Sequence, residues 1–117
     1  MKCIFCKIAS HEVPADVVYE DDEIIAFHDI NPLAPVHVLI IPKKHYDSVN
    51  NISQQDSLLM GKVLVTARNI AKDLQIDEKG YKLLFRVGQD GGQEVDHLHL
   101  HLIGGAQLYE EIRPMLQ

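Results

Sequence analysis

The segment from His97 to Ile103 alternates imidazole and aliphatic side chains, residue by residue. Successive side chains of a β-strand point to opposite faces, so this alternation predicts a strand. Its three leucines then face a core, and its three histidines share the other face, each about 6.6 Å from the next. Glycine pairs flank the segment. Gly91 and Gly92 allow close approach of the backbone to a ligand, and Gly104 and Gly105 end the strand.

Four further short apolar segments predict strands, which gives five in total. The five predicted strands are Val17–Glu20, Glu23–His28, Val36–Ile41, Tyr81–Val87 and His97–Ile103. The third of these is almost entirely apolar, so we expect it at the centre of the sheet. A loop with two prolines, residues 29–35, precedes it.

Apolar residues recur at spacings of three and four in the middle of the chain, which predicts one long amphipathic helix over about Gln54–Gln75. Its apolar face consists of Leu59, Val63, Ala67, Ile70 and Leu74. Ser53 is placed to cap its N-terminus. Glycine at position 61 lowers the stability of the helix by about 1 kcal/mol relative to alanine. Either close packing against a partner element requires this glycine, or the helix simply tolerates it. A short apolar face in residues 3–10 predicts a second, shorter helix.

Five strands and one long helix predict an α+β domain with the helix on one face of the sheet. The length of 117 residues predicts a single domain, residues 1–117. The net charge of −6 argues against binding to a nucleic-acid polymer, which needs a basic surface, but it allows binding of one nucleotide. No apolar run approaches the roughly 18 residues of a membrane span, and no leader pattern opens the chain. We therefore expect a cytoplasmic protein.

The candidate functional residues of this segment are His97, His99 and His101, and three interpretations of them compete. The strand is merely structural, or alternate histidines share a metal ion, or the imidazoles act as catalysts on an anion. The last is the sharpest, because neutral imidazole is both a nucleophile and a proton carrier near pH 7.

The pattern His-x-His-x-His with apolar residues between resembles the signature of the histidine-triad (HIT) nucleotide hydrolases and transferases. The flanking letters GGQEV and IGG are similar to the branch of histidine-triad nucleotide-binding proteins, which hydrolyse nucleoside phosphoramidates. Segments Ile4–Ile8, Ala26–Asn31 and Ala34–His45 match as well. The resemblance implies a HIT-like fold with an antiparallel sheet, and a homodimer that merges two such sheets.

The resemblance also implies roles for four histidines. His99 corresponds to the nucleophile, which attacks the α-phosphorus and forms a nucleotidyl-histidine that water then hydrolyses. His101 lies beside the same phosphate, where it donates hydrogen bonds or passes a proton. His97 orients the other two, and His37 matches a fourth histidine of the site.

For the nucleotide, the resemblance assigns Asp29 to the ribose hydroxyls, because a carboxylate accepts two hydrogen bonds from a diol. Gln93, Glu94 and Val95 correspond to phosphate-binding positions that use side chains and main-chain N–H groups. The base pocket corresponds to Ile4, Phe5, Ile8, Phe27, Ile30 and Leu39. Such apolar walls favour a purine through surface area.

Three positions depart from the family pattern. Arg86 stands where relatives commonly have asparagine, and either clamps the phosphate or turns outward. Glu94 replaces a serine of many animal relatives, and Asp96 replaces an aromatic residue. Because of these departures, the resemblance does not identify the leaving group of the substrate.

Cys3 and Cys6 form a C-x-x-C motif, which suggests metal or redox chemistry in a reducing compartment. The resemblance adds His45 and His97 as two further ligands for a structural zinc ion. The alternative is two reduced cysteines near the N-terminus. A catalytic zinc on all three triad histidines is disfavoured, because it would consume the lone pair of His99, so we expect that catalysis requires no cofactor.

These observations favour an enzyme that hydrolyses purine nucleoside phosphoramidates. The transferase branch carries glutamine at the position of His101. Dinucleoside polyphosphate hydrolases, the nearest rival, have Pro-Arg in place of Gly104 and Gly105. A non-catalytic nucleotide-binding or scaffolding module is the remaining alternative.

Overall fold

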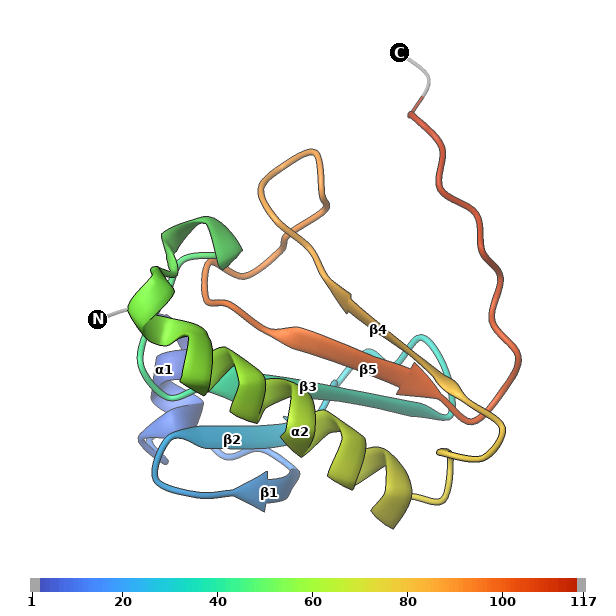
Figure 1. Cartoon of the computed structure of the whole chain (residues 1–117), viewed down its shortest axis with the longest axis horizontal. Coiled ribbons are helices and arrows are strands. Elements are labelled where there is room, and N and C mark those ends of the chain that lie inside the picture. Colours follow the sequence, from blue (N-terminus) through green and yellow to red (C-terminus); the bar gives the residue numbers. More distant parts are fainter. Residues whose placement is uncertain (1–2, 116–117) are drawn as a thin grey trace.

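A five-stranded antiparallel sheet in the order β1-β2-β3-β5-β4 organises the chain (Figure 1). The computed structural model describes residues 3–115. The strands are β1 Val17–Glu20, β2 Ile24–His28, β3 Val36–Pro42, β4 Tyr81–Phe85 and β5 Leu100–Gly104. The helices are α1 Ile4–Ala9 and α2 Ser57–Asp73, and two 3-10 turns, η1 Val49–Asn51 and η2 Gln54–Asp56, precede α2. The predicted α+β class and antiparallel sheet are confirmed.

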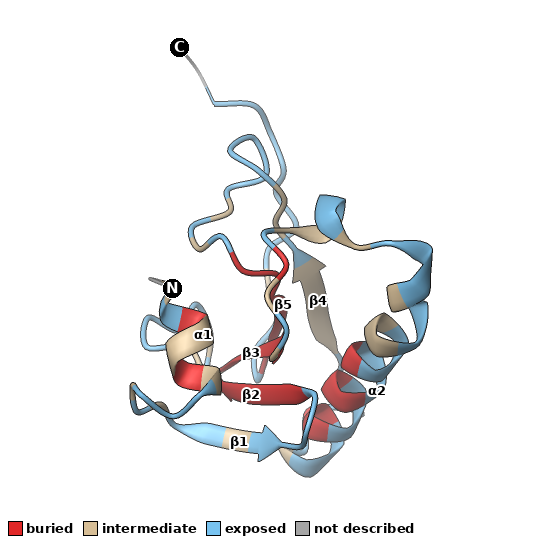
Figure 2. Cartoon of the chain, turned by 90° about the vertical axis from the view of Figure 1, so that its left-hand side faces the viewer, coloured by how far each residue is buried: buried red, intermediate tan, exposed pale blue. Residues whose placement is uncertain are grey.

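Helix α2 covers one face of the sheet, and α1 packs on the other (Figure 2). The side of α2 that is buried against the sheet includes Val63, Ala67 and Ile70, as the spacing predicted. Leu59 and Leu74, at its two ends, are only partly buried. The β3 strand is buried along nearly its whole length between β2 and β5, which confirms its central place.

The fifth strand is shorter than predicted, because it begins at Leu100 rather than at His97. Its partner β3 ends at Pro42, which has no N–H to continue the ladder. The N–H of Leu98 donates instead to the carbonyl of Tyr46, at 2.7 Å. The side chains of residues 97–99 nevertheless remain buried, so the alternation continues beyond the hydrogen-bonded strand.

The long helix also begins later than predicted, at Ser57 instead of Gln54. Ser53 caps the preceding 3-10 turn η2, where its N–H and hydroxyl donate to the carboxylate of Asp56 at 2.7 and 3.1 Å. At the other end Gln75 adopts a left-handed conformation with φ of 61°, which closes the helix without a glycine.

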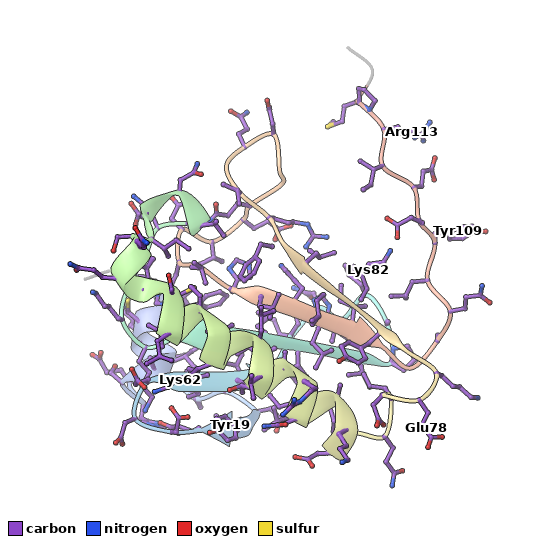
Figure 3. All side chains as sticks on the ribbon, viewed as in Figure 1. Tyr19, Lys62, Glu78, Lys82, Tyr109 and Arg113 are labelled. Atoms are coloured by element: carbon purple, nitrogen blue, oxygen red, sulfur yellow. The ribbon has the colours of Figure 1, made fainter. Side chains whose placement is uncertain are left out.

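After β5 the chain leaves the sheet as an exposed tail (Figure 3). Lys82 on β4 holds it, donating to the carbonyl of Tyr109 at 2.9 Å and pairing with Glu110 at 2.8 Å. The described residues contain no helix of the length and apolarity that a membrane span requires.

Candidate active site

Four histidines meet on the sheet face opposite α2. His37, His97, His99 and His101 are only 0–7% exposed, so the histidine face of the predicted strand is buried. Phe5 of α1 packs edge-on against the rings of His97 and His99, with centroids 6.0 and 5.1 Å apart. Helix α1 therefore encloses the part of the triad that lies beyond the paired strand.

A cavity of about 970 Å³ opens beside these histidines. Of the predicted site residues, its wall includes Ile4, Phe5, Ile8, Phe27, Asp29, Ile30, His37, Leu39, Arg86, Glu94, Val95, His99 and His101. Of the predicted catalytic and nucleotide-binding residues, two do not line it. His97 points to a separate cluster, and the side-chain amide of Gln93 bonds to Asp47 and Val95 carbonyls at 2.6 and 2.9 Å. Gln93 thus secures the loop before the triad.

The cavity wall also includes residues that the sequence did not single out, among them Val13, Ala15 and Leu33. Val13 and Ala15 pack with the cluster around Phe5, so the apolar character of the segment after α1 was an available signal. Leu33 contributes its backbone N–H, which donates to His37 Nδ1 at 3.1 Å. No sequence pattern predicts such a backbone contact.

The ring of His99 is held in one neutral tautomer. Its Nδ1–H donates to the carbonyl of His97 at 2.7 Å. The Nε2 atom then carries a free lone pair at the cavity. Burial lowers the pKa of His99 below its usual range, which keeps the ring neutral. This is the condition that a nucleophilic imidazole must meet.

His101 and His37 form a second group on adjacent strands. His37 Nε2 lies 2.9 Å from His101 Nδ1 and 3.5 Å from a carboxylate oxygen of Asp29. Arg86 turns inward rather than outward, and its Nη1 lies 3.2 Å from His101 Nε2. Burial lowers the pKa of His101 to about 3, and the neighbouring Arg86 guanidinium lowers it further.

Asp29 lies at the mouth of the cavity with a half-buried carboxylate. One carboxylate oxygen accepts the backbone N–H of Asn31 at 2.9 Å, which fixes the side chain. The other oxygen faces His37. The carboxylate is therefore oriented, and it can still accept hydrogen bonds from a ligand.

Cys3, Cys6, His45 and His97 lie close enough to hold a metal ion, with their ligand atoms all within 4.8 Å of one another. The two cysteines face the same way because C-x-x-C spans about one turn of helix α1. The distances are 3.4 Å from Cys3 Sγ to His97 Nδ1, 3.2 Å from Cys6 Sγ to His45 Nδ1, and 3.1 Å between the two Nδ1 atoms.

These separations fit a tetrahedral ion. Bond lengths for zinc imply about 3.4 Å between two nitrogen ligands and about 3.6 Å between nitrogen and sulfur. Both histidines also have their other nitrogen fixed. His97 Nε2 donates to the carbonyl of Pro42 at 2.8 Å, and His45 Nε2 donates to Asp47 at 2.6 Å. Both Nδ1 lone pairs therefore point into the cluster, the arrangement that metal-binding histidines use.

Comparison with known proteins identifies the family. The HIT domain profile matches residues 10–108. The chain is 45% identical over 105 residues to a purine nucleoside phosphoramidase of Escherichia coli K12, covering 90% of this chain and 88% of that protein. It is 49% identical over 102 residues to protein HitA of Neisseria gonorrhoeae, covering 87% of this chain and 94% of that protein.

Solved structures agree with the sequence comparison. A HIT family hydrolase from Legionella pneumophila Philadelphia 1 superposes with a TM-score of 0.91 at 51% identity, covering 92% of this chain and 96% of that one. A histidine triad protein from Clostridium difficile superposes with a TM-score of 0.93 at 46% identity, covering 96% of this chain and 97% of that one. Because these matches extend over most of the chain, the protein belongs to the HIT domain family, as the histidine pattern predicted.

Proposed function

We propose that the protein hydrolyses purine nucleoside phosphoramidates through a covalent intermediate on His99. The observation that carries the proposal is the 2.7 Å hydrogen bond from His99 Nδ1–H to the carbonyl of His97, which leaves Nε2 as a free base at the cavity. The name of the Escherichia coli relative, a purine nucleoside phosphoramidase, supports the substrate class.

The reaction proceeds in two displacements. His99 Nε2 attacks the α-phosphorus, the P–N bond to the substrate amine breaks, and the departing amine takes up one proton. Water then attacks the same phosphorus, the bond to His99 breaks, and the water releases one proton. The products are an amine and a nucleoside monophosphate, and His99 returns to its neutral tautomer.

The direct test is mass spectrometry of protein quenched during turnover of adenosine phosphoramidate. We expect an added adenylyl group on the peptide that contains His99. An adduct on a different residue would reassign the nucleophile. Turnover without any adduct, in rapid-quench samples that span the first turnover, would argue for direct attack by water.

Asp29 is proposed to bind the ribose diol. We expect Asp29→Asn to weaken binding of adenosine monophosphate about 10-fold, because hydrogen bonds to a charged group contribute about 1.5–3 kcal/mol. Asparagine still accepts the N–H of Asn31, so the loop keeps its shape. Calorimetry with the 2′,3′-dideoxy nucleotide is the control. An equal loss for both nucleotides would place Asp29 outside ribose recognition.

A nucleotide-binding pocket without turnover would also use Asp29 and the apolar wall, but it would not need a tautomer-locked His99. The rival dinucleoside polyphosphate hydrolase is disfavoured by the two glycines at the end of β5, Gly104 and Gly105. A Cβ on Gly104 would lie 2.9 Å from Ile76 Cδ1, and Gly105 has φ of 85° with a Cβ position 3.0 Å from Pro35. A side chain at position 105 would be strained by this φ, whereas a side chain at position 104 would require the end of Ile76 to shift.

We also infer that the protein is a homodimer. Strand β4 is a sheet edge, and unpaired edges are a liability that proteins cover. Helix α2 exposes Leu58, Leu64 and Val65 at 74, 50 and 46%. A Cβ on Gly61, on the same helix, would meet nothing within 4 Å, so close packing within the chain does not explain that glycine. A second copy on α2 and β4 accounts for all of these features.

The dimer is testable by light scattering at micromolar concentration. We expect the wild-type protein to have twice the mass of the chain, and Val65→Glu to shift it to the monomer, because a buried unpaired carboxylate opposes association. Lys79→Glu, an exposed charge change in the loop before β4, is the control and should remain dimeric. A wild-type monomer at this concentration would contradict the inference.

A further inference from the structure

A row of hydrogen-bonding nitrogens crosses the site from the backbone N–H of Leu33 to the guanidinium of Arg86. The N–H of Leu33 lies 3.1 Å from His37 Nδ1. His37 Nε2 lies 2.9 Å from His101 Nδ1, and His101 Nε2 lies 3.2 Å from Arg86 Nη1. The first group of the row can only donate, and so can the last.

The first donor fixes the protons along the row. Because Leu33 N–H donates to His37 Nδ1, that nitrogen is unprotonated and the proton of His37 lies on Nε2. His37 Nε2–H then donates to His101 Nδ1, which must accept. A neutral His101 therefore carries its proton on Nε2.

This assignment places two donors against each other at the cavity. His101 Nε2–H and Arg86 Nη1–H both point toward the same space, and neither can accept from the other. Among the described residues no carboxylate forms an ion pair with Arg86, although its side chain is half-buried. Two adjacent donors, one of them cationic, need an anionic acceptor between them.

The reacting phosphate supplies that acceptor in the proposed function, on which this inference rests. The rings of His101 and His99 lie 4.8 Å apart, so an oxygen held by His101 belongs to the group that His99 attacks. We propose that Arg86 is a catalytic residue, which with His101 Nε2–H binds one non-bridging oxygen of the reacting phosphate. Negative charge on that oxygen increases during attack, so the pair stabilises the transition state more than the ground state.

Gly92 lies against the side chain of Arg86. A Cβ on Gly92 would lie 3.5 Å from Arg86 Cδ and 3.9 Å from Nε, so the arginine stem runs directly along the loop before the triad. Gly92 also has φ of 78°, which favours glycine at this position. The loop and the arginine therefore form one wall of the phosphate site.

The first test separates binding of the phosphate from binding of the nucleoside. Calorimetry measures the affinities of adenosine monophosphate and adenosine for wild type, Arg86→Gln, Arg86→Lys and the exposed charge control Lys79→Gln. We expect Arg86→Gln to weaken the monophosphate about 10- to 100-fold and to leave adenosine within about twofold, with Arg86→Lys intermediate because lysine cannot replace the planar fork. Unchanged adenosine affinity also shows that the variant is folded.

The second test asks whether Arg86 acts on one particular oxygen. The two diastereomers of an adenosine phosphorothioamidate carry sulfur at one or the other non-bridging position. We expect wild type to hydrolyse one diastereomer much faster, and Arg86→Gln to reduce that ratio about 10-fold or more, since sulfur accepts hydrogen bonds poorly. Arg86→Gln should also lower kcat more than it raises KM.

The outcomes distinguish the proposals. An Arg86→Gln protein that retains the wild-type preference for monophosphate over adenosine, or the wild-type diastereomer ratio, overturns the role of Arg86. A wild-type protein that hydrolyses no phosphoramidate overturns the proposed function. If Arg86→Gln then still loses affinity for the monophosphate alone, Arg86 is confirmed as a phosphate-binding residue without that activity.

Discussion

His99→Ala is expected to lower turnover of adenosine phosphoramidate by more than about 100-fold while adenosine monophosphate still binds. A misplacement of about 1 Å at a catalytic group can already cost about 100-fold in rate. The variant removes the group altogether. His101 cannot substitute for it, because the proton on its Nε2 and the contact to Arg86 leave no free lone pair facing the phosphate.

Binding should survive in this variant because other residues provide it. Asp29 is fixed by the N–H of Asn31, and the apolar wall around Phe27 and Leu39 belongs to the core of β2 and β3. Turnover and calorimetric affinity are measured on the same preparation, with His11→Asn, an exposed histidine outside the cavity, as the control. Near-normal turnover in His99→Ala would show that the chemistry does not pass through this residue. Joint loss of binding and turnover would instead indicate damage to the strand.

Local patterns predicted the parts of the fold that depend on local physics. The period of two in residues 97–103 and the spacing of three and four in residues 57–73 reflect which side chains face the core. Element ends were less accurate, because they depend on partners elsewhere in the chain. The late start of β5 depends on Pro42 of the neighbouring strand, and the late start of α2 depends on the turn that Ser53 and Asp56 form.

The sequence likewise predicted only the part of the site that depends on local pattern. The alternation placed three histidines on one face but could not assign them different partners. His97 faces two cysteines at the start of the N-terminal helix, whereas His101 faces His37 on β3 and Arg86, which directly follows β4. The contact that fixes the protons of the second group comes from the backbone of Leu33, so no side chain encodes it. Such assignments require the assembled sheet.

Loss of the proposed zinc ion is expected to destabilise the protein strongly. If the cluster of Cys3, Cys6, His45 and His97 binds zinc only in the folded state, free zinc at about 1,000 times Kd stabilises that state by about 4 kcal/mol. In a domain of this size about 1 kcal/mol corresponds to about 4 °C in Tm. Purified protein should then contain about one zinc ion per chain, and Cys3→Ser should lose it and melt about 15 °C lower.

Turnover should fall in the same variant, because the cluster and the nucleophile share His97. Its ring Nδ1 points into the cluster, and its Nε2 is bonded to the carbonyl of Pro42. The carbonyl of His97 holds His99 Nδ1 at 2.7 Å, so a displaced His97 releases the ring that attacks phosphorus. Metal analysis, thermal melting and kcat are therefore measured together for wild type, Cys3→Ser and Cys3→Asp, which keeps a zinc-binding side chain. Metal-free wild-type protein of undiminished stability, prepared without chelators, would contradict the zinc site and leave two reduced cysteines packed beside the triad.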